Sequence, residues 1–153
     1  MKRNFCILFC LLLLIPVFLP AQTAALMEQL LGTHAVSYEQ AAKFVLEAAD
    51  LGDFSSTAST ADAFNYAAER NWLPKRVSGS DEAVLQGVSL LIMQSFGFRG
   101  GLFYSMVQNP HYAYRELVYQ EIIQGRTDPQ MAVSGEYLLF MIGRALGKVE
   151  DEL

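Results

Sequence analysis

The chain has 153 residues, 52% of them hydrophobic, and it carries 11 Lys and Arg against 16 Asp and Glu, a net charge of −5. This acidic balance argues against a nucleic-acid partner, because nucleic-acid binding depends on basic residues that neutralise phosphates. The basic residues are scattered, so the sequence also lacks the polybasic cluster that would hold a protein on an anionic membrane.

The N-terminus has the pattern of a cleavable signal peptide. Lys2 and Arg3 precede an apolar run over 5–19, and small residues follow it. The run is shorter than the roughly 20 residues that a membrane-spanning helix needs, and Pro16 interrupts it. We therefore expect removal of residues 1–23, with the cut between 21 and 25. An uncleaved N-terminal anchor is the alternative.

Processing at this place would change the chain that remains. Both cysteines, Cys6 and Cys10, would be lost with the leader, and the net charge would become −7. A domain of this size buries enough apolar surface to fold without disulfides. We expect residues 24–153 to form a single helical domain with no stable membrane insertion.

Hydrophobic periodicity, caps and helix breakers predict seven helices and no sustained strand, so the expected fold class is all-α. The third helix could begin at 60 or 62 and the fourth at 80 or 81. The expected helices cover 24–31, 38–50, 60–73, 81–97, 102–107, 112–123 and 136–146.

Local signals set the expected boundaries of these helices. Ser37 is a candidate N-cap for the second helix, and residues 51–60 are the best internal loop. Pro74 is expected to end the third helix and Gly147 the last. The second half of the fourth helix and most of the last are apolar on all sides, which predicts that both are buried.

A repeated pattern becomes visible when the chain is shifted by 50 residues. Ile92 then falls on Ile142, and Gly97 on Gly147. We expect a small bundle built from two or three helix-loop-helix repeats. Three Val-Ser pairs mark candidate starts of three units, at 36–37, 77–78 and 133–134.

Residues 122–129 (Ile-Ile-Gln-Gly-Arg-Thr-Asp-Pro) and 133–138 (Val-Ser-Gly-Glu-Tyr-Leu) carry a family resemblance. Together they resemble the helix end, loop and next helix start of the S-layer homology (SLH) domain. The resemblance implies a bundle of three repeats that binds cell-envelope polysaccharide without catalysis. The sequence departs from the family where its ligand-contacting Arg would stand, since the residues at that place are Tyr38, Gly79 and Gly135.

Few residues could carry catalysis or hold a metal. His34 and His111 each lack a second His or a carboxylate at metal-ligand spacing, and zinc sites need three or four ligands. The glycine-rich segment 97–101 lacks the Lys and Ser or Thr of a phosphate-binding loop, and no Gly-x-Ser-x-Gly elbow occurs. We therefore expect a protein without enzyme activity, metal or cofactor.

Aromatic residues provide the candidate ligand-binding site. Tyr112 and Tyr119 are seven residues apart, about two turns along one face of a helix. With Arg99, Arg115 or Arg126 they could line a groove for a sugar or a peptide. These five residues form the predicted site.

These features predict an exported, non-catalytic binding or scaffolding module, periplasmic or attached to the bacterial cell envelope, with an envelope polysaccharide or envelope protein as its partner. The alternative is a protein–protein interaction or assembly subunit of the periplasm without glycan affinity. The C-terminal residues 150–153 (Glu-Asp-Glu-Leu) resemble an endoplasmic-reticulum retention signal with its first residue changed, so the lumen of that compartment is an alternative location.

Overall fold

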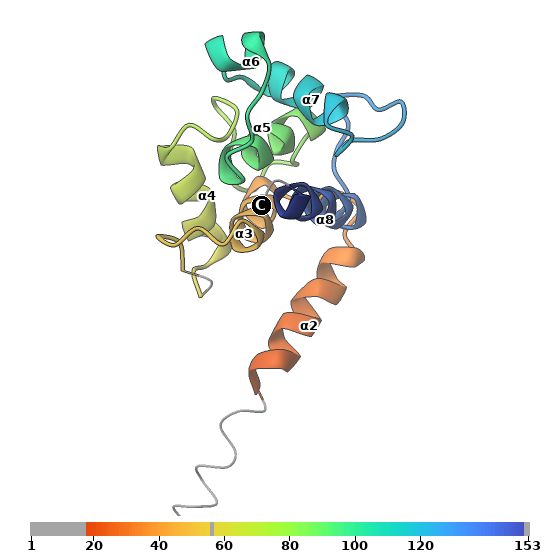
Figure 1. Cartoon of the computed structure of the whole chain (residues 1–153). Helices are drawn as coiled ribbons and strands as arrows, with labels where there is room; N and C mark the ends of the chain where they lie inside the picture. The colour runs from red at the N-terminus through yellow and green to blue at the C-terminus, as the bar shows by residue number, and fades with distance from the viewer. Residues whose placement is uncertain (1–17, 56, 152–153) are drawn as a thin grey trace, which may run out of the picture. The chain divides into compact units, whose positions relative to one another are not determined.

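The computed structural model describes residues 18–55 and 57–151 (Figure 1). Most of the predicted signal peptide, residues 1–17, therefore lies outside the described residues. The chain divides into two compact units, 1–32 and 33–153. The larger unit thus begins at 33, after the first predicted helix and before the second.

The first unit contains the helix α2, Phe18–Leu31. It starts earlier than the helix expected at 24 and continues without a break through the predicted cleavage window at 21–25. Among the described residues, no helix combines the length and the apolar character needed to span a membrane.

The second unit holds six helices, and α5 packs against both α3 and α7, while α3 also packs against α4 and α8 (Figure 1). With α2 there are seven helices and no strand in the described part of the chain, which confirms the all-α prediction. The six helices are α3 (Tyr38–Ala48), α4 (Thr60–Glu69), α5 (Leu85–Ser95), α6 (Leu102–Met106), α7 (Pro110–Tyr119) and α8 (Gly135–Asp151).

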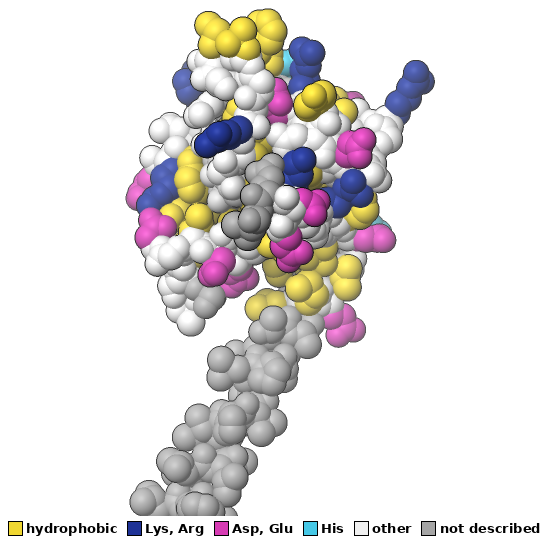
Figure 2. Space-filling model, in the orientation of Figure 1, with side chains coloured by type: hydrophobic (Ala, Val, Ile, Leu, Met, Phe, Trp, Pro, Cys, Tyr) yellow, Lys and Arg dark blue, Asp and Glu magenta, His cyan; other side chains and the backbone are white. Residues whose placement is uncertain are grey.

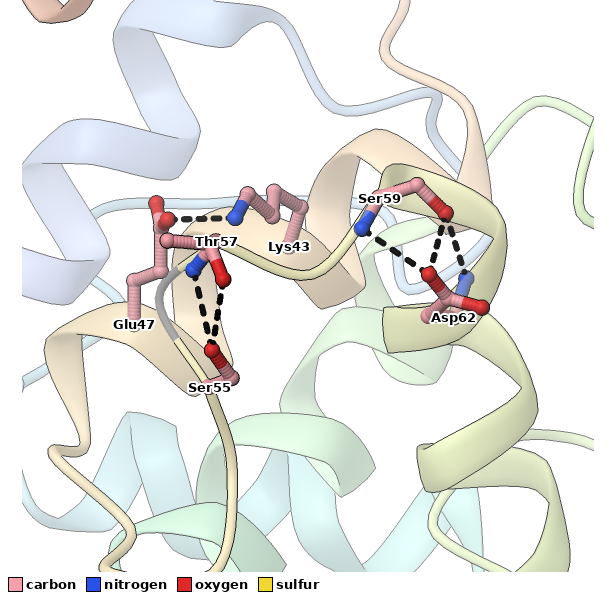
Figure 3. A network of polar contacts seen from close by, with 6 residues as sticks. All are labelled: Lys43, Glu47, Ser55, Thr57, Ser59 and Asp62. Carbon is pink, nitrogen blue, oxygen red and sulfur yellow. Dashed lines mark hydrogen bonds and ion pairs between the residues drawn. The ribbon is translucent and has the colours of Figure 1, made fainter.

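Two helices begin with reciprocal capping boxes. Ser37 Oγ accepts from the backbone N–H of Gln40, and the Gln40 side chain accepts from the Ser37 N–H, which confirms the predicted cap of α3. Ser59 and Asp62 form the same pair before α4 (Figure 3). The cap of α4 is therefore Ser59, and Asp62 is its partner at the third position of the helix.

The helices α4 and α7 end in the same way at positions 50 residues apart. Trp72 N donates to Ala67 O, and Ile122 N donates to Leu117 O, both over 2.9 Å. The residues before these donors, at 71 and 121, have left-handed backbones with φ of 59° and 61°. Such a residue stops a helix because its backbone cannot continue the right-handed turn. Both helices consequently end earlier than the predicted 73 and 123.

The start of α5 differs from the prediction, since the helix begins at Leu85 and not at 80 or 81. Its N-cap, Val84, has no side-chain acceptor. The first two amide groups, of Leu85 and Gln86, donate to the carbonyls of Met131 and Pro129, each over 2.9 Å. A distant segment therefore satisfies the free N–H groups that a local cap would otherwise satisfy.

Three segments close a ring of backbone hydrogen bonds. Val36 N donates to Val133 O (2.8 Å), Val133 N to Ala83 O (3.0 Å), and Ala83 N to Val36 O (2.8 Å). All three side chains are fully buried, and each residue lies just before one of the helices α3, α5 and α8. The middle position belongs to Ala83, so the Val-Ser pair at 77–78 does not match the place of the other two pairs.

The two most apolar helices differ in burial. Nearly all side chains of α5 are buried, as predicted. The expectation that α8 is buried all round is wrong, because its buried face from Leu138 to Ala145 is accompanied by Phe140, which is 42% exposed. The helix also continues through Gly147 to Asp151. Packing of the buried face outweighs the roughly 1 kcal/mol by which glycine disfavours a helix.

Candidate functional site

The candidate site is a groove of about 500 Å³ beside the first two turns of α8. The loop after α7 supplies one wall and α8 supplies the other. We name it the α8 groove, and its lining residues are Gln124, Met131, Ser134, Glu136, Tyr137 and Phe140.

Local hydrogen bonds hold the loop wall in place. The carboxylate of Asp128 accepts from Gln130 N (2.8 Å), and the Asp128 carbonyl accepts from Met131 N (3.0 Å), which forms a tight turn. At the start of the helix wall, Ser134 Oγ accepts from Tyr137 N over 3.2 Å. Local hydrogen bonds therefore fix the backbone of both walls of the groove.

Two stacked aromatic rings form the apolar surface of the groove. The rings of Tyr137 and Phe140 are nearly parallel, with 6.1 Å between centroids and 9° between planes. The Arg144 guanidinium lies 5.5 Å from the centroid of Phe140, and Arg144 Nε donates to Glu121 O over 2.7 Å. In the amide orientation that satisfies both partners, the Gln124 side-chain oxygen accepts from both terminal nitrogens of Arg144, at 3.0 and 2.9 Å. Arg144 therefore joins the loop wall to the aromatic surface.

The hydroxyl of Tyr137 is buried and has no hydrogen-bond partner among the described residues. Burial raises the pKa of this hydroxyl, and the nearby Tyr114 raises it further. The Tyr114 hydroxyl is itself engaged, since it donates to Thr127 O over 2.8 Å. An unpaired buried hydroxyl costs about 1–3 kcal/mol.

The groove also presents a carboxylate. Glu136 is in the first turn of α8, where the positive end of the helix dipole stabilises a negative charge. Together the lining offers an aromatic face, a carboxylate, an amide and hydroxyl groups. These groups can bind a neutral, hydroxyl-rich molecule by stacking and by hydrogen bonds.

A second hollow, of about 550 Å³, lies where the C-terminal ends of α3, α5 and α8 come together. Its lining is mainly apolar and includes Trp72, Phe96 and Leu146. Ser95 also lines it, and the Ser95 hydroxyl is buried without a partner among the described residues. The α8 groove differs from this hollow in its pair of stacked aromatic rings, and we take the groove as the candidate site for that reason.

The structure brings together two of the five residues predicted for ligand binding. Arg99 and Tyr119 line a shallow hollow of about 370 Å³ with Glu116, and Tyr119 is 85% exposed. Tyr112 instead stacks on Phe103 of α6, with 5.9 Å between centroids and 17° between planes.

The other two predicted residues, Arg115 and Arg126, are exposed on α7 and on the loop that follows it. Neither lines the hollow that Arg99 and Tyr119 share. The predicted five-residue groove is therefore divided among separate places on the surface, and a binding role for these residues stays a prediction.

One sequence pattern does indicate the aromatic face of the α8 groove, although the predicted site was based on the spacing of Tyr112 and Tyr119. Tyr137 and Phe140 are three residues apart, which places them on one helix face. Gln124 carried no comparable signal, because only the fold brings the loop after α7 beside α8.

The described residues contain no group of three or more His, Cys, Asp or Glu side chains that could hold a metal ion. Comparisons of the chain with protein-family models, with curated proteins and with solved structures found no match.

Proposed function

We propose that this protein is an exported, non-catalytic binding module of the bacterial cell envelope, and that its α8 groove binds an envelope polysaccharide. One observation carries the proposal: the stacked rings of Tyr137 and Phe140 line the groove beside the carboxylate of Glu136.

The chemistry of a sugar matches the two kinds of surface in the groove. A sugar ring has an apolar C–H face, which packs on an aromatic ring such as Phe140, and a rim of hydroxyl groups that donate and accept hydrogen bonds. Glu136 can accept from such hydroxyls, and the Ser134 hydroxyl can either donate or accept. A volume of about 500 Å³ is within the usual range for a ligand site and suits a short stretch of polymer.

The proposal extends to the architecture of the second unit. The hydrogen-bonded ring of Val36, Ala83 and Val133 and the matched helix ends 50 residues apart support three related units, as the SLH resemblance implies. The family's ligand-contacting Arg is absent from the helix starts. Arg144 lies beside Phe140 but outside the lining of the α8 groove, so the proposed site binds its ligand without a basic side chain.

Sedimentation with purified, insoluble cell-wall polysaccharide tests this function. The full chain is expressed in a bacterial host and purified in the form that the cells accumulate. We expect the wild-type protein to sediment with the polysaccharide, and Phe140→Ala to weaken binding about tenfold, the effect of losing a central aromatic contact. Phe140 is partly exposed, so the variant should remain folded.

Tyr119→Ala is the matched control, because it removes an exposed aromatic ring from the other predicted site. It should bind as the wild type does. Loss of binding in Tyr119→Ala with none in Phe140→Ala would refute the α8 groove. Failure of the wild-type protein to bind any envelope polysaccharide would refute the glycan ligand itself.

A further inference from the structure

The short helix α6 presents a group of exposed apolar side chains at one edge of the second unit, where Figure 2 shows hydrophobic side chains gathered together. We name this group the α6 tip, and it consists of Leu102 (73% exposed), Phe103 (66%), Met106 (74%) and Val107 (52%). Single exposed apolar residues are ordinary on a protein surface, whereas adjacent ones mark an interaction site.

One buried residue of α6 anchors the α6 tip to the rest of the second unit. Tyr104 is 3% exposed, and its hydroxyl accepts from Gln94 Nε2 over 2.8 Å. Burial raises the pKa of Tyr104 to about 12, against the opposing effect of the Gln94 hydrogen bond. Ser105 Oγ also donates to Gly100 O over 3.2 Å. Because Tyr104 occupies the inner side of the helix, its neighbours in the tip face outward.

The charge around the α6 tip differs from that of the rest of the chain. No Asp or Glu occurs between Glu82 and Glu116, although the whole chain has 16. Arg99 and Arg115 lie in this segment, and both are exposed. Dark blue Lys or Arg side chains lie on both sides of the apolar group in Figure 2. Glu116, the nearest acid after the tip in the sequence, is half-buried, and its carboxylate lies beside Gly101, the N-cap of α6, in the hollow that it lines with Arg99.

We propose that the α6 tip docks on an anionic lipid surface. Apolar side chains on a projecting helix enter the boundary between headgroups and acyl chains, and flanking basic residues bind the negative headgroups. A helix of five residues is far too short to cross a bilayer, so the contact is shallow. The sequence has no polybasic cluster, so the apolar side chains supply the main contact, and Arg99 and Arg115 add the preference for anionic headgroups.

Flotation with lipid vesicles tests the proposal. The protein is expressed as the full chain and purified in its accumulated form, and its N-terminus is sequenced. Vesicles of phosphatidylglycerol with phosphatidylethanolamine are compared with vesicles of phosphatidylcholine alone. We expect the wild-type protein to float with the anionic vesicles only, and less at high salt concentration.

Two sets of variants separate the apolar from the electrostatic contribution. Leu102→Ser combined with Met106→Ser should weaken vesicle binding about tenfold or more. Arg99→Gln and Arg115→Gln should each weaken it about fivefold at low salt, the effect expected for one basic residue near an anionic surface. All four side chains are exposed, so thermal unfolding should be unchanged, which circular dichroism checks.

Phe140→Ala is the matched control, because it removes an exposed aromatic side chain from the α8 groove. It should bind vesicles as the wild type does, while the α6-tip variants should keep their polysaccharide binding. The two proposals can therefore fail separately.

Four results would overturn the lipid assignment. The wild-type protein could fail to bind anionic vesicles, or bind neutral vesicles equally well. The tip variants could bind as the wild type does, which would be the result if a retained leader caused the binding. Lastly, the tip variants could lose a co-purifying protein while the wild type ignores vesicles, which would assign the tip to a protein partner.

Discussion

The connection from α3 to α4 and the connection from α5 to α7 differ in how their aromatic residues are packed. The connection from α3 to α4 is bonded back onto α4. Asp53 accepts from Tyr66 Oη (2.6 Å) and from a terminal nitrogen of Arg70 (2.9 Å). The Arg70 guanidinium lies 3.5 Å from the centroid of the Tyr66 ring, and Phe54 meets that ring edge-on.

The connection from α5 to α7 contains α6 and buries two aromatic side chains, Phe98 and Tyr104. The large apolar side chains of the α6 tip, by contrast, are more than half exposed. The first connection therefore satisfies its aromatic and charged groups internally, while the second keeps an exposed apolar surface in which Phe103 stacks on Tyr112 of α7. The comparison teaches that the exposure of the α6 tip belongs to one connection and is not a general property of these loops.

The largest expected effect concerns the anchor of α6. Tyr104→Ala should lower the free energy of unfolding by about 3–5 kcal/mol, because it removes a buried aromatic ring and leaves a cavity. Tyr104→Phe keeps the ring and should cost only about 1 kcal/mol for the lost hydrogen bond. Urea denaturation measures both. If Tyr104→Ala were as stable as the wild type, α6 would be loosely attached and the proposed contrast with the α3–α4 connection would disappear.

A smaller effect is expected at Gly100, directly beneath α6. A Cβ atom added there would clash with Cβ, Cγ and Cδ1 of the Tyr104 side chain. Gly100→Ala should therefore destabilise the protein by about 1–3 kcal/mol through overpacking. Gly52, in the other connection, has no atom within 4 Å of its added Cβ, so Gly52→Ala is the control and should cost less. Equal stability of the two variants would contradict the close packing of Tyr104 on Gly100.

The charged network of the α3–α4 connection predicts a pH-dependent effect. The hydrogen bond from Tyr66, assisted by Arg70, lowers the pKa of Asp53 below its ordinary value of 3.8. A lowered pKa in the folded state adds stability above the ordinary pKa, and this stability is lost as the pH falls through the folded-state value. The urea midpoint of Asp53→Asn should therefore be slightly below that of wild type near neutral pH.

The difference between Asp53→Asn and wild type should vanish in strong acid, once Asp53 is protonated in both states. Urea titrations from about pH 7 to about pH 2 follow it. In an Arg70→Gln background, the same substitution should have a smaller effect, because the two side chains interact directly. A difference that persists unchanged in acid would show that the charge of Asp53 is not responsible.

The smallest expected effect is at the α6 tip itself. Met106→Ser should change the free energy of unfolding by no more than about 0.5 kcal/mol, because its side chain is 74% exposed. Thermal and urea unfolding measure the change. Pronounced destabilisation would mean that Met106 packs within the folded protein, and it would remove the apolar tip as a surface available to a partner.

Much of the local structure was predictable from neighbouring residues. Ser37 marked the start of α3, and the dense apolar run after Val88 marked α5 as a buried helix. These features depend on side chains within one or two turns of each other, so a reader of the sequence has all the necessary information. Of the α8 groove, the sequence indicates only the aromatic face, through the spacing of Tyr137 and Phe140.

The sequence by itself determined that the chain forms short helices separated by polar turns, because periodicity and capping are local properties. Only the tertiary structure decided where α5 begins, because its first amide groups bind carbonyls of the segment before α8. Only the tertiary structure placed Gln124 beside Phe140 and turned the α6 tip outward. Contacts between residues far apart in the chain depend on how the helices pack, and no local pattern encodes that packing.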